Sequence, residues 1–327
     1  MKQISFVSKM SCAYEYISDA RVAELLTWED VLEAAERALE SVSTGDAYQS
    51  TRAHLTVGQS FNSVNTMSGY LQDKKYGSLV HLFFNPFRGN RNLDPPLPVV
   101  HSEITLVDET TGVSKAMISG NETMRWITPA VSVVATKHLH RKGKETLAIL
   151  GAGNQGRIHA MAFQRYFNFS KVRVWNRTRS KAENLVNELN QGTNKGVFTT
   201  SSTVEDCVSG ADVIVTATHS SQTLVKKSWI KAGAHINAIG VSPVNTELDA
   251  DTYRICKIYS DYKEGAEAEL KHIEKLGAKF EGQVGDVISG KISPPKESDT
   301  TIFQSLGMAV QYCAICRLIY DKHHFKQ

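Results

Sequence analysis

A glycine-rich turn, Gly151-Ala-Gly-Asn-Gln-Gly156, constrains the fold of this chain more than any other feature of its sequence. It directly follows an apolar stretch at 146–150 and precedes a segment of helical periodicity at 157–166. In a strand–turn–helix unit, such glycines permit a tight turn and let the backbone approach a pyrophosphate, while the helix N-terminus presents unpaired N–H groups. The turn therefore predicts a dinucleotide site formed by Gly151, Ala152, Gly153, Asn154 and Gln155.

The segment around and after this turn alternates between strand-like and helix-like patterns. Strands are predicted at 146–150, 172–175, 213–216, 234–239 and 257–259, and helices at 157–166, 180–190 and 204–208. The connections are short, which is typical of a parallel sheet with crossover helices. We therefore expect an α/β protein with a Rossmann-type, doubly wound parallel sheet.

The N-terminal part shows a different pattern, that of an α+β domain. Thr27 has the sequence context of a capping box and precedes an amphipathic helix that reaches Val42. Strands are predicted at 79–84, 103–107 and 113–118, with a hairpin loop at 108–112. The stretch 85–98 holds four of the eight prolines, so we expect a long loop there.

The chain has 327 residues, which exceeds the ~100–200 residues of a usual single domain, so we expect two domains. Thr128 and Pro129 read as a cap and a first-turn proline that open a helix at 130–140. A last helix, from Ser305 to about Lys322, is expected to pack back on the first domain. The predicted division is therefore 1–128 plus 303–327 for the first domain and 129–302 for the Rossmann domain.

The end of the second Rossmann strand predicts which nucleotide is bound. An acidic residue at that position would bind the ribose hydroxyls of NAD, but this chain has Asn176, Arg177 and Thr178 there. Arg177 can pair with a 2′-phosphate, while Asn176 and Thr178 can donate hydrogen bonds. NADP(H) is therefore the expected cofactor. The alternative is that Arg177 and Arg179 form only a solvated surface pair.

Composition and charge argue against several other classes of function. The net charge of +3 is spread along the chain, so we expect no nucleic-acid surface, and no apolar stretch approaches the ~20 residues of a membrane span. The five cysteines and the absence of a secretory pattern at 1–13 predict a cytoplasmic protein with reduced thiols. Cys313-x-x-Cys316 reads as two core thiols, and His138-x-His140 does not suit a metal, so we expect no metal site.

Six segments together make the chain resemble the ornithine cyclodeaminase/mu-crystallin family, with the mu-crystallin, or ketimine reductase, branch the most similar. They are Ile149-Leu-Gly-Ala-Gly-Asn-Gln155, Val174-Trp-Asn-Arg-Thr178, Gly210-Ala-Asp-Val-Ile214, Gly233-Ala-His-Ile-Asn-Ala238, Thr246-Glu-Leu-Asp249 and Ser305-Leu-Gly-Met-Ala-Val310. The resemblance covers nearly the whole chain. It implies a homodimer in which the first domain and the C-terminal helix serve substrate binding and dimerisation.

The resemblance also assigns roles to single residues. Arg52 falls at the family arginine that grips the substrate carboxylate, although a surface arginine is the alternative. Thr128, Thr218 and the turn at Ile239 match positions that line the cofactor, and Ser305 matches one beside the nicotinamide. His101 lies close to residues near the cofactor and could supply a proton, the alternative being a hydrogen-bonded histidine at a strand end.

Three positions depart from the family pattern. The family lysine that contacts substrate matches Ser78, at the start of the strand 79–84, and neither Lys74 nor Lys75 is an obvious replacement. A second family arginine matches Ile127. The aspartate typical of the cyclodeaminases matches Val241, so the general base of deamination is missing.

These patterns lead to one expected function and two alternatives. We expect an NADPH-dependent reductase of the C=N bond of a small, often cyclic, imine or imino acid, with Arg52, Ser78 and His101 as candidate catalytic positions. The first alternative is a protein that binds NADPH and a small hydrophobic acid such as thyroid hormone without efficient turnover. The second keeps the reductase but replaces the substrate with a bulkier or uncharged imine, because Ile127 and Val241 would make the pocket apolar.

Overall fold

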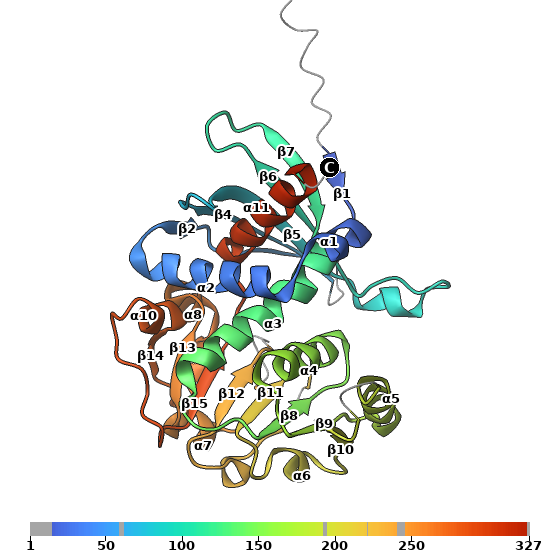
Figure 1. Ribbon diagram of the computed structural model, residues 1–327, viewed down its shortest axis with the longest axis vertical. Coiled ribbons are helices and arrows are strands. Elements are labelled where there is room, and N and C mark those ends of the chain that lie inside the picture. Colours follow the sequence, from blue (N-terminus) through green and yellow to red (C-terminus); the bar gives the residue numbers. More distant parts are fainter. Residues whose placement is uncertain (1–14, 59–61, 192–194, 221, 241–245, 326–327) are drawn as a thin grey trace, which may run out of the picture.

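The computed structural model describes residues 15–58, 62–191, 195–220, 222–240 and 246–325. These residues form two sheets, one above the other in Figure 1, and the long helix α3 (Gly120–Leu139) passes between them. α3 contacts β5 and β6 of the upper sheet and β12 and β15 of the lower sheet, whose bounds follow below. It therefore connects the two halves of the molecule.

The upper sheet is mostly antiparallel. Its order is β1 (Glu15–Ile17), β7 (Ser114–Ser119), β6 (Val100–Val107), β5 (Ser78–Pro86), β4 (Ser63–Leu71) and β2 (Ala47–Gln49), with β3 (Ala53–Thr56) also paired to β4. The predicted hairpin at 108–112 is confirmed, since β6 and β7 pair antiparallel across it. The predicted long loop at 85–98 contains the end of β5 and a short 3-10 helix, η1 (Arg88–Asn92).

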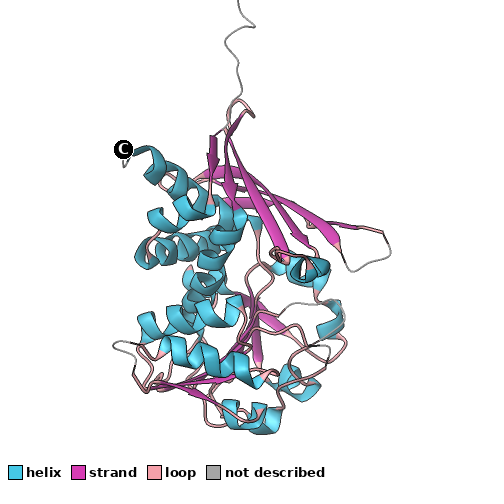
Figure 2. Cartoon of the chain, turned by 90° about the vertical axis from the view of Figure 1, so that its right-hand side faces the viewer, coloured by secondary structure: helices cyan, strands magenta, loops and turns pink. Residues whose placement is uncertain are grey.

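Three helices cover one side of this sheet, as Figure 2 shows: α1 (Asp19–Leu25), α2 (Trp28–Thr44) and α11 (Ala309–Phe325). α2 starts as predicted, because the Thr27 hydroxyl accepts the N–H of Asp30 at 3.4 Å. The predicted C-terminal helix packs back on the upper sheet, although it begins at Ala309 rather than Ser305. Cys313 and Cys316 are fully buried in it, which confirms them as core residues.

The lower sheet is entirely parallel within the described residues and confirms the Rossmann-type α/β fold. Its order is β10 (Phe198–Thr200), β9 (Lys171–Trp175), β8 (Thr146–Leu150), β11 (Val213–Thr216), β12 (His235–Ala238), β15 (Thr301–Gln304), β13 (Lys257–Ser260) and β14 (Phe280–Gln283). β10, β14 and β15 were not predicted. The other elements here are α4 (Asn154–Phe167), α5 (Arg179–Leu189), α6 (Val204–Val208), η3 (Lys227–Trp229), α7 (Ala250–Ile255), α8 (Lys263–Glu269), α9 (Lys271–Glu274) and α10 (Val284–Ile288).

The prediction that Thr128 caps a helix opened by Pro129 is wrong. α3 already begins at Gly120, and Pro129 lies inside it. An interior proline costs one helical hydrogen bond, but α3 packs on both sheets, and that packing offsets the loss. The predicted domain limits at 128/129 and 302/303 fall within α3 and β15, so the division stays a prediction.

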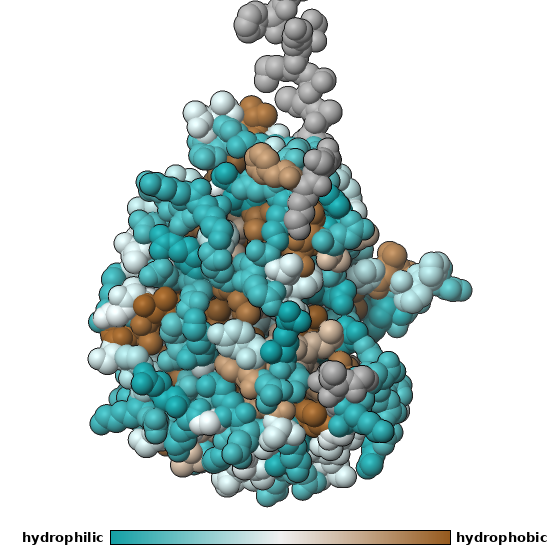
Figure 3. Space-filling view, viewed as in Figure 1, coloured by the Kyte–Doolittle hydropathy of each residue, from teal (hydrophilic) through white to brown (hydrophobic). Residues whose placement is uncertain are grey.

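The surface that carries α2, α3 and α4 is mostly hydrophilic, with scattered apolar patches (Figure 3). Among the described helices, none combines the length and the apolar character that crossing a bilayer requires.

Candidate functional site

The predicted phosphate-binding turn lies at the carboxyl end of β8, where α4 begins. Gly151 adopts a φ of 110°, and a Cβ there would lie 2.4 Å from the Ala217 carbonyl oxygen. A Cβ on Gly156 would lie 1.8 Å from the Gly151 carbonyl oxygen, so only glycine fits either position. By contrast, a Cβ on Gly153, at the N-cap of α4, would meet no atom within 4 Å. The turn is therefore tightly packed at Gly151 and Gly156, whereas Gly153 leaves space in which a phosphate could approach the backbone.

Asn176 supports this turn from the end of β9. Its Oδ1 accepts the N–H of Ala152 at 3.1 Å, and its Nδ2 donates to the carbonyl of Thr178 at 2.9 Å. Its amide thus holds the loop in place, a role that the sequence prediction of a direct phosphate donor did not include. Arg177 and Thr178 are exposed, and the Arg177 side chain makes no hydrogen bond or ion pair with any described residue. The Arg177 guanidinium is therefore open to solvent.

A buried carboxylate, Glu247, ties together the ends of β11 and β12. Its Oε1 accepts both the backbone N–H of Thr218 at 2.8 Å and the Thr218 hydroxyl at 2.5 Å. Its Oε2 packs so tightly on Gly240 that a Cβ there would come within 2.4 Å. Burial raises the pKa of Glu247. The family segment 246–249 contained this residue, but no sequence pattern pointed to its contact with Thr218.

Between the two sheets lies a cleft of about 490 Å³. Five of the predicted site residues meet in its wall: Arg52, Thr128, Thr218, Ile239 and Ser305. The rest of the wall is largely apolar. Side chains that sequence reasoning missed here include Met67, Leu82, Phe84, Met124, Val131, His219, Gln311 and Tyr312. The cleft lies beside the carboxyl ends of the parallel strands, which is where ligands of open α/β sheets bind.

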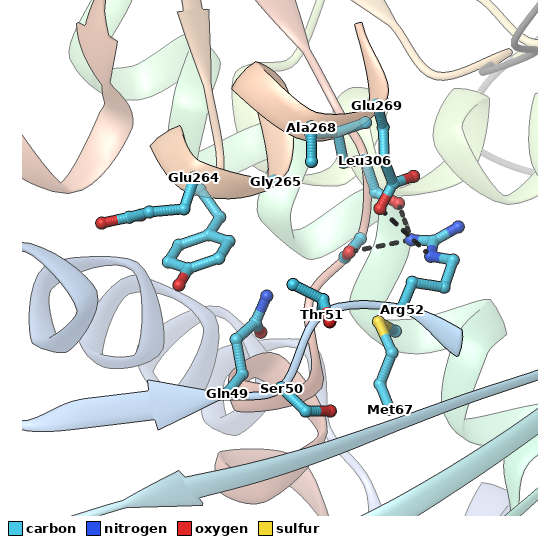
Figure 4. A pocket seen from close by; sticks show the side chains of 12 residues that line it. Gln49, Ser50, Thr51, Arg52, Met67, Glu264, Gly265, Ala268, Glu269 and Leu306 are labelled. Atoms are coloured by element: carbon cyan, nitrogen blue, oxygen red, sulfur yellow. Dashed lines mark hydrogen bonds and ion pairs between the residues drawn. The ribbon is translucent and has the colours of Figure 1, made fainter. Parts of the chain in front are cut away.

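Arg52 is held on several sides. Its Nη2 donates to the carbonyl oxygens of Leu306 at 2.8 Å and Gly307 at 3.2 Å. Its Nε lies 3.5 Å from a carboxylate oxygen of Glu269, and its guanidinium carbon lies 5.1 Å from the centre of the Phe84 ring. Figure 4 shows the contacts of Arg52 with Glu269 and with the two carbonyls, seen from a smaller cavity of about 90 Å³ that shares Arg52 and Met67 with the main cleft. Nη1 makes no hydrogen bond within the described part of the chain.

A second buried carboxylate, Asp261, directly follows β13. Its Oδ2 accepts the N–H groups of Leu306 at 3.0 Å and Gly307 at 2.8 Å, and the Ser305 hydroxyl lies 3.4 Å away. Burial raises the pKa of Asp261, and the charge of Arg52 partly opposes that rise. Sequence reasoning missed this residue, because an aspartate at a strand end carries no distinctive local pattern.

Few ionisable groups line the cleft. Among the described residues they are Arg52, Arg88, His219 and Tyr312, with no lysine and no carboxylate. Partial burial, and then the charge of Arg88, lowers the pKa of His219, whereas burial raises that of Tyr312. In the described part of the chain, no three histidine, cysteine, aspartate or glutamate side chains are grouped so as to hold a metal.

Comparison with known families then assigns the chain. The model of the ornithine cyclodeaminase/mu-crystallin family matches residues 15–327. The chain belongs to this family. It is similar to the ketimine reductase mu-crystallins of Mus musculus, with 35% identity over 293 residues (89% of this chain, 90% of the relative), and Rattus norvegicus, with 38% over 226 residues (69% and 70%).

Solved structures share the family's fold over almost the whole chain. One is the Delta(1)-pyrroline-2-carboxylate reductase of Thermococcus litoralis in complex with NADH and L-proline, with a TM-score of 0.88, 26% identity, and coverage of 95% of this chain and 98% of that one. Another is an archaeal alanine dehydrogenase dimer with bound NAD, with a TM-score of 0.87, 25% identity, and coverage of 96% and 97%.

Two of the three catalytic positions expected from the family lie outside the cleft. Ser78 is buried at the far end of β5, where its hydroxyl donates to the Cys313 carbonyl at 2.9 Å. The β5 side chains that reach the cleft are Leu82, Phe84 and Pro86. The expectation for Ser78 is therefore wrong, because the cleft begins four residues further along the strand.

His101 was also expected near the cofactor, but it does not line the cleft. It lines a separate surface pocket together with Phe83 and Asn85, whereas its neighbour Val100 lines the cleft. Successive strand residues face opposite sides of a sheet, so His101 points away from the site. Ile127 is fully buried in α3 and does not line the cleft either, and Val241 lies outside the described residues.

Proposed function

We propose that this chain is an NADPH-dependent reductase of the C=N bond of a small cyclic imino acid. The observation that carries the proposal is the meeting of two parts in one cleft: a nucleotide-binding edge and an arginine with an unused Nη1. Relatives point the same way, since ketimine reductases and Delta(1)-pyrroline-2-carboxylate reductases are among them.

The residues at the carboxyl edge of the lower sheet fit a nicotinamide dinucleotide. The open face of Gly153 and the N-terminus of α4 suit a pyrophosphate, and Thr218, Ile239 and Ser305 in the cleft wall would border the ring. Arg177 would pair with a 2′-phosphate, which favours NADPH over NADH. The similar solved structures contain NADH or NAD, so the proposed preference for NADPH rests on Arg177 and not on these relatives.

Arg52 would bind the substrate carboxylate through Nη1, since Nη2 is occupied by two carbonyls. Met67, Leu82 and Phe84 would surround the ring and exclude water from the reacting carbon. A bound nicotinamide supplies the hydride. An iminium substrate already carries the proton that the product nitrogen needs, so hydride addition to its carbon completes the reduction. Neither His101 nor a lysine is required as an acid, and partial burial, together with the charge of Arg88, lowers the pKa of His219.

The direct test is a turnover assay. Purified protein is mixed with NADPH or NADH and a set of cyclic imines, with and without a carboxylate on the carbon of the C=N bond. We expect nicotinamide oxidation with NADPH and carboxylated cyclic imines, at rates that fall as the pH rises and the iminium form is lost. Nucleotide binding without oxidation by any imine would contradict the proposal.

The absence of lysine and carboxylate from the described cleft wall favours one other function, the binding of NADPH and a small hydrophobic acid without efficient turnover. A thyroid hormone analogue is the probe for it. If the analogue binds tightly in the presence of NADPH while no imine is reduced, the binding function replaces the reductase.

We also propose that the chain forms a homodimer through the face of the upper sheet that α1, α2 and α11 leave uncovered (Figure 2). Large apolar side chains are exposed on that sheet, namely Tyr16, Tyr48, Leu55 and Phe83. Light scattering should give twice the chain mass, and Phe83→Glu should shift it toward the monomer. A monomer at micromolar concentration would contradict this arrangement.

A further inference from the structure

The turn between β15 and α11, residues 305–308, lies between two oppositely charged side chains. Asp261 lies on one side of it and Arg52 on the other. The two come from distant parts of the chain: Arg52 directly follows the loop after β2, and Asp261 follows β13. Because β13 and β15 pair in parallel register, with Ser260 opposite Gln304, Asp261 is brought beside Ser305.

A single peptide group links the two charges. Asp261 Oδ2 accepts the N–H of Gly307 at 2.8 Å, and the carbonyl of the same peptide unit, that of Leu306, accepts from Arg52 Nη2 at 2.8 Å. A carboxylate at one end of a peptide and a guanidinium at the other polarise it in the same sense, so each hydrogen bond strengthens the other. The N–H of Leu306 adds a second bond to Asp261, and the carbonyl of Gly307 a second bond to Arg52.

Asp261 belongs to the interior, not to the cleft wall. It is fully buried, and its Oδ1 has no hydrogen-bond partner within the described residues. A buried carboxylate is unfavourable unless it is hydrogen-bonded, so Asp261 is stabilised mainly by its bonds to the two N–H groups and the Ser305 hydroxyl of the turn. The turn is correspondingly fixed, and with it the position of the two carbonyls that hold Nη2.

We propose that Asp261 is a positioning residue for substrate binding: through the Leu306–Gly307 peptide it fixes the guanidinium of Arg52 with Nη1 directed to the substrate carboxylate. The inference rests on the proposed function for the identity of that carboxylate. It assigns Asp261 no contact with substrate or cofactor. It predicts that loss of Asp261 affects carboxylated substrates through Arg52 and leaves other substrates almost unaffected.

The experiment compares two imines of the same ring, Δ1-piperideine-2-carboxylate and Δ1-piperideine. Asp261→Ala should raise the KM of the carboxylated imine at least tenfold and change that of the uncharged imine less than twofold. Asp261→Asn, whose amide oxygen accepts the same two N–H groups, should restore most of the loss, with a KM within about threefold of the unmodified protein. In an Arg52→Ala background, Asp261→Ala should change the KM of the carboxylated imine by less than a further twofold.

Asp249→Asn is the matched control. Asp249 is another aspartate that accepts backbone N–H groups, those of Thr252 at 2.9 Å and Lys227 at 3.1 Å, but it caps α7 away from the cleft. This variant should leave both KM values unchanged. If Asp261→Ala does not fold, Asp261→Asn carries the test. Its smaller rise in KM must still be confined to the carboxylated imine, and it must disappear in the Arg52→Ala background.

The inference is overturned if the Asp261 variants change both KM values equally, or if their full effect persists without Arg52. These outcomes differ from failure of the proposed function, in which the unmodified protein reduces neither imine. In that case, calorimetric affinity for the cyclic amino acid piperidine-2-carboxylate tests the same link without turnover. A loss of affinity in Asp261→Ala that is absent in the Arg52→Ala background supports the link, and an unchanged affinity overturns it.

Discussion

The two walls of the cleft are built in different ways. On the nucleotide side, the groups offered to a ligand are mainly backbone groups of one continuous segment, with Gly151, Gly153 and Gly156 within six residues. On the substrate side, Arg52 takes its position from the carbonyls of Leu306 and Gly307, about 250 residues further along the chain. A local motif can be read from sequence, whereas a site assembled by long-range contacts depends on the folded arrangement.

The largest expected effect separates folding from binding within the glycine turn. Gly156→Ala would place a Cβ against the Gly151 carbonyl, and we expect a loss of roughly 3–5 kcal/mol of unfolding free energy. Gly153→Ala meets no neighbouring atom, so it should keep the stability of the unmodified protein while lowering nucleotide affinity at least about tenfold. Urea denaturation and calorimetric titration measure the two. Equal stability losses would show that the turn is uniformly packed.

Arg52 gives the next largest effect and tests the substrate side alone. Arg52→Ala should cost about 2–3 kcal/mol of carboxylate binding, roughly a 30- to 150-fold rise in KM for an imino acid. Arg52→Lys keeps the positive charge but not the planar guanidinium with its several N–H donors, so it should recover only part of the lost carboxylate binding. Nucleotide affinity should not change in either variant. An unchanged KM would return Arg52 to a purely structural role.

Arg177 tests the nucleotide side in the same manner. It is exposed, so Arg177→Ala should weaken NADPH binding by about 1.5–2 kcal/mol and leave NADH binding almost unchanged. Fluorescence titration with both nucleotides measures the preference, and Arg179→Ala is the control, since Arg179 pairs with Glu183. Tighter NADH than NADPH binding in the unmodified protein would remove the basis for this assignment.

The helix behind the glycine turn should make the nucleotide side sensitive to acid. Burial lowers the pKa of His159 to about 4, while its ring contacts the Gln155 carbonyl and the Ser132 hydroxyl. As the pH falls below the ordinary value of 6.5, the unfolded chain takes up a proton that the folded chain refuses, so stability is lost between about pH 6.5 and pH 4.

In His159→Gln, the loss of unfolding free energy between pH 7 and pH 5 should be smaller by roughly 2 kcal/mol. Urea denaturation at several pH values measures this difference. His235, whose pKa burial also lowers, supplies a remaining acid sensitivity. Parallel pH profiles for the variant and the unmodified protein would show that His159 is not the responsible group.

The smallest effects are expected at Ser78 and His101. Ser78→Ala removes a hydrogen bond to the Cys313 carbonyl, and His101→Ala changes a surface pocket on the far side of the sheet. Both variants should keep KM and kcat within twofold, although Ser78→Ala should lose about 1 kcal/mol of stability. Steady-state kinetics of both variants decide this. A tenfold fall in kcat for either would mean that the cleft extends further than the geometry indicates.

The sequence allowed prediction of those parts of the fold that local chemistry determines. The turn at 151–156, the Thr27 cap and the strands β8, β9, β11, β12 and β13 were all predicted at nearly their observed positions. β15 was not predicted, although it lies inside the lower sheet, between β12 and β13. Its insertion there depends on pairing across a long stretch of sequence, for which periodicity gives no information.

The same limit explains the errors within the site. Ser78 was selected because it matches the family lysine that contacts substrate, but the part of β5 that reaches the cleft is decided by where α11 covers the sheet. Pro129 was taken for a helix start because prolines favour the first turn, and packing of α3 on both sheets overrode that preference. Asp261 and Glu247 could not be selected at all, because their importance lies in contacts with distant residues.

The proline inside α3 also has a mechanical consequence. Pro129 has no N–H to offer the Arg125 carbonyl, so the helix is most easily bent at that turn. α3 touches both sheets, and Thr128, beside the proline, forms part of the cleft wall. A bend at this point would therefore change the angle between the two sheets without breaking a further helical hydrogen bond. The residue that was predicted to start a helix thus leaves α3 with its weakest backbone hydrogen bonding at the level of the cleft wall.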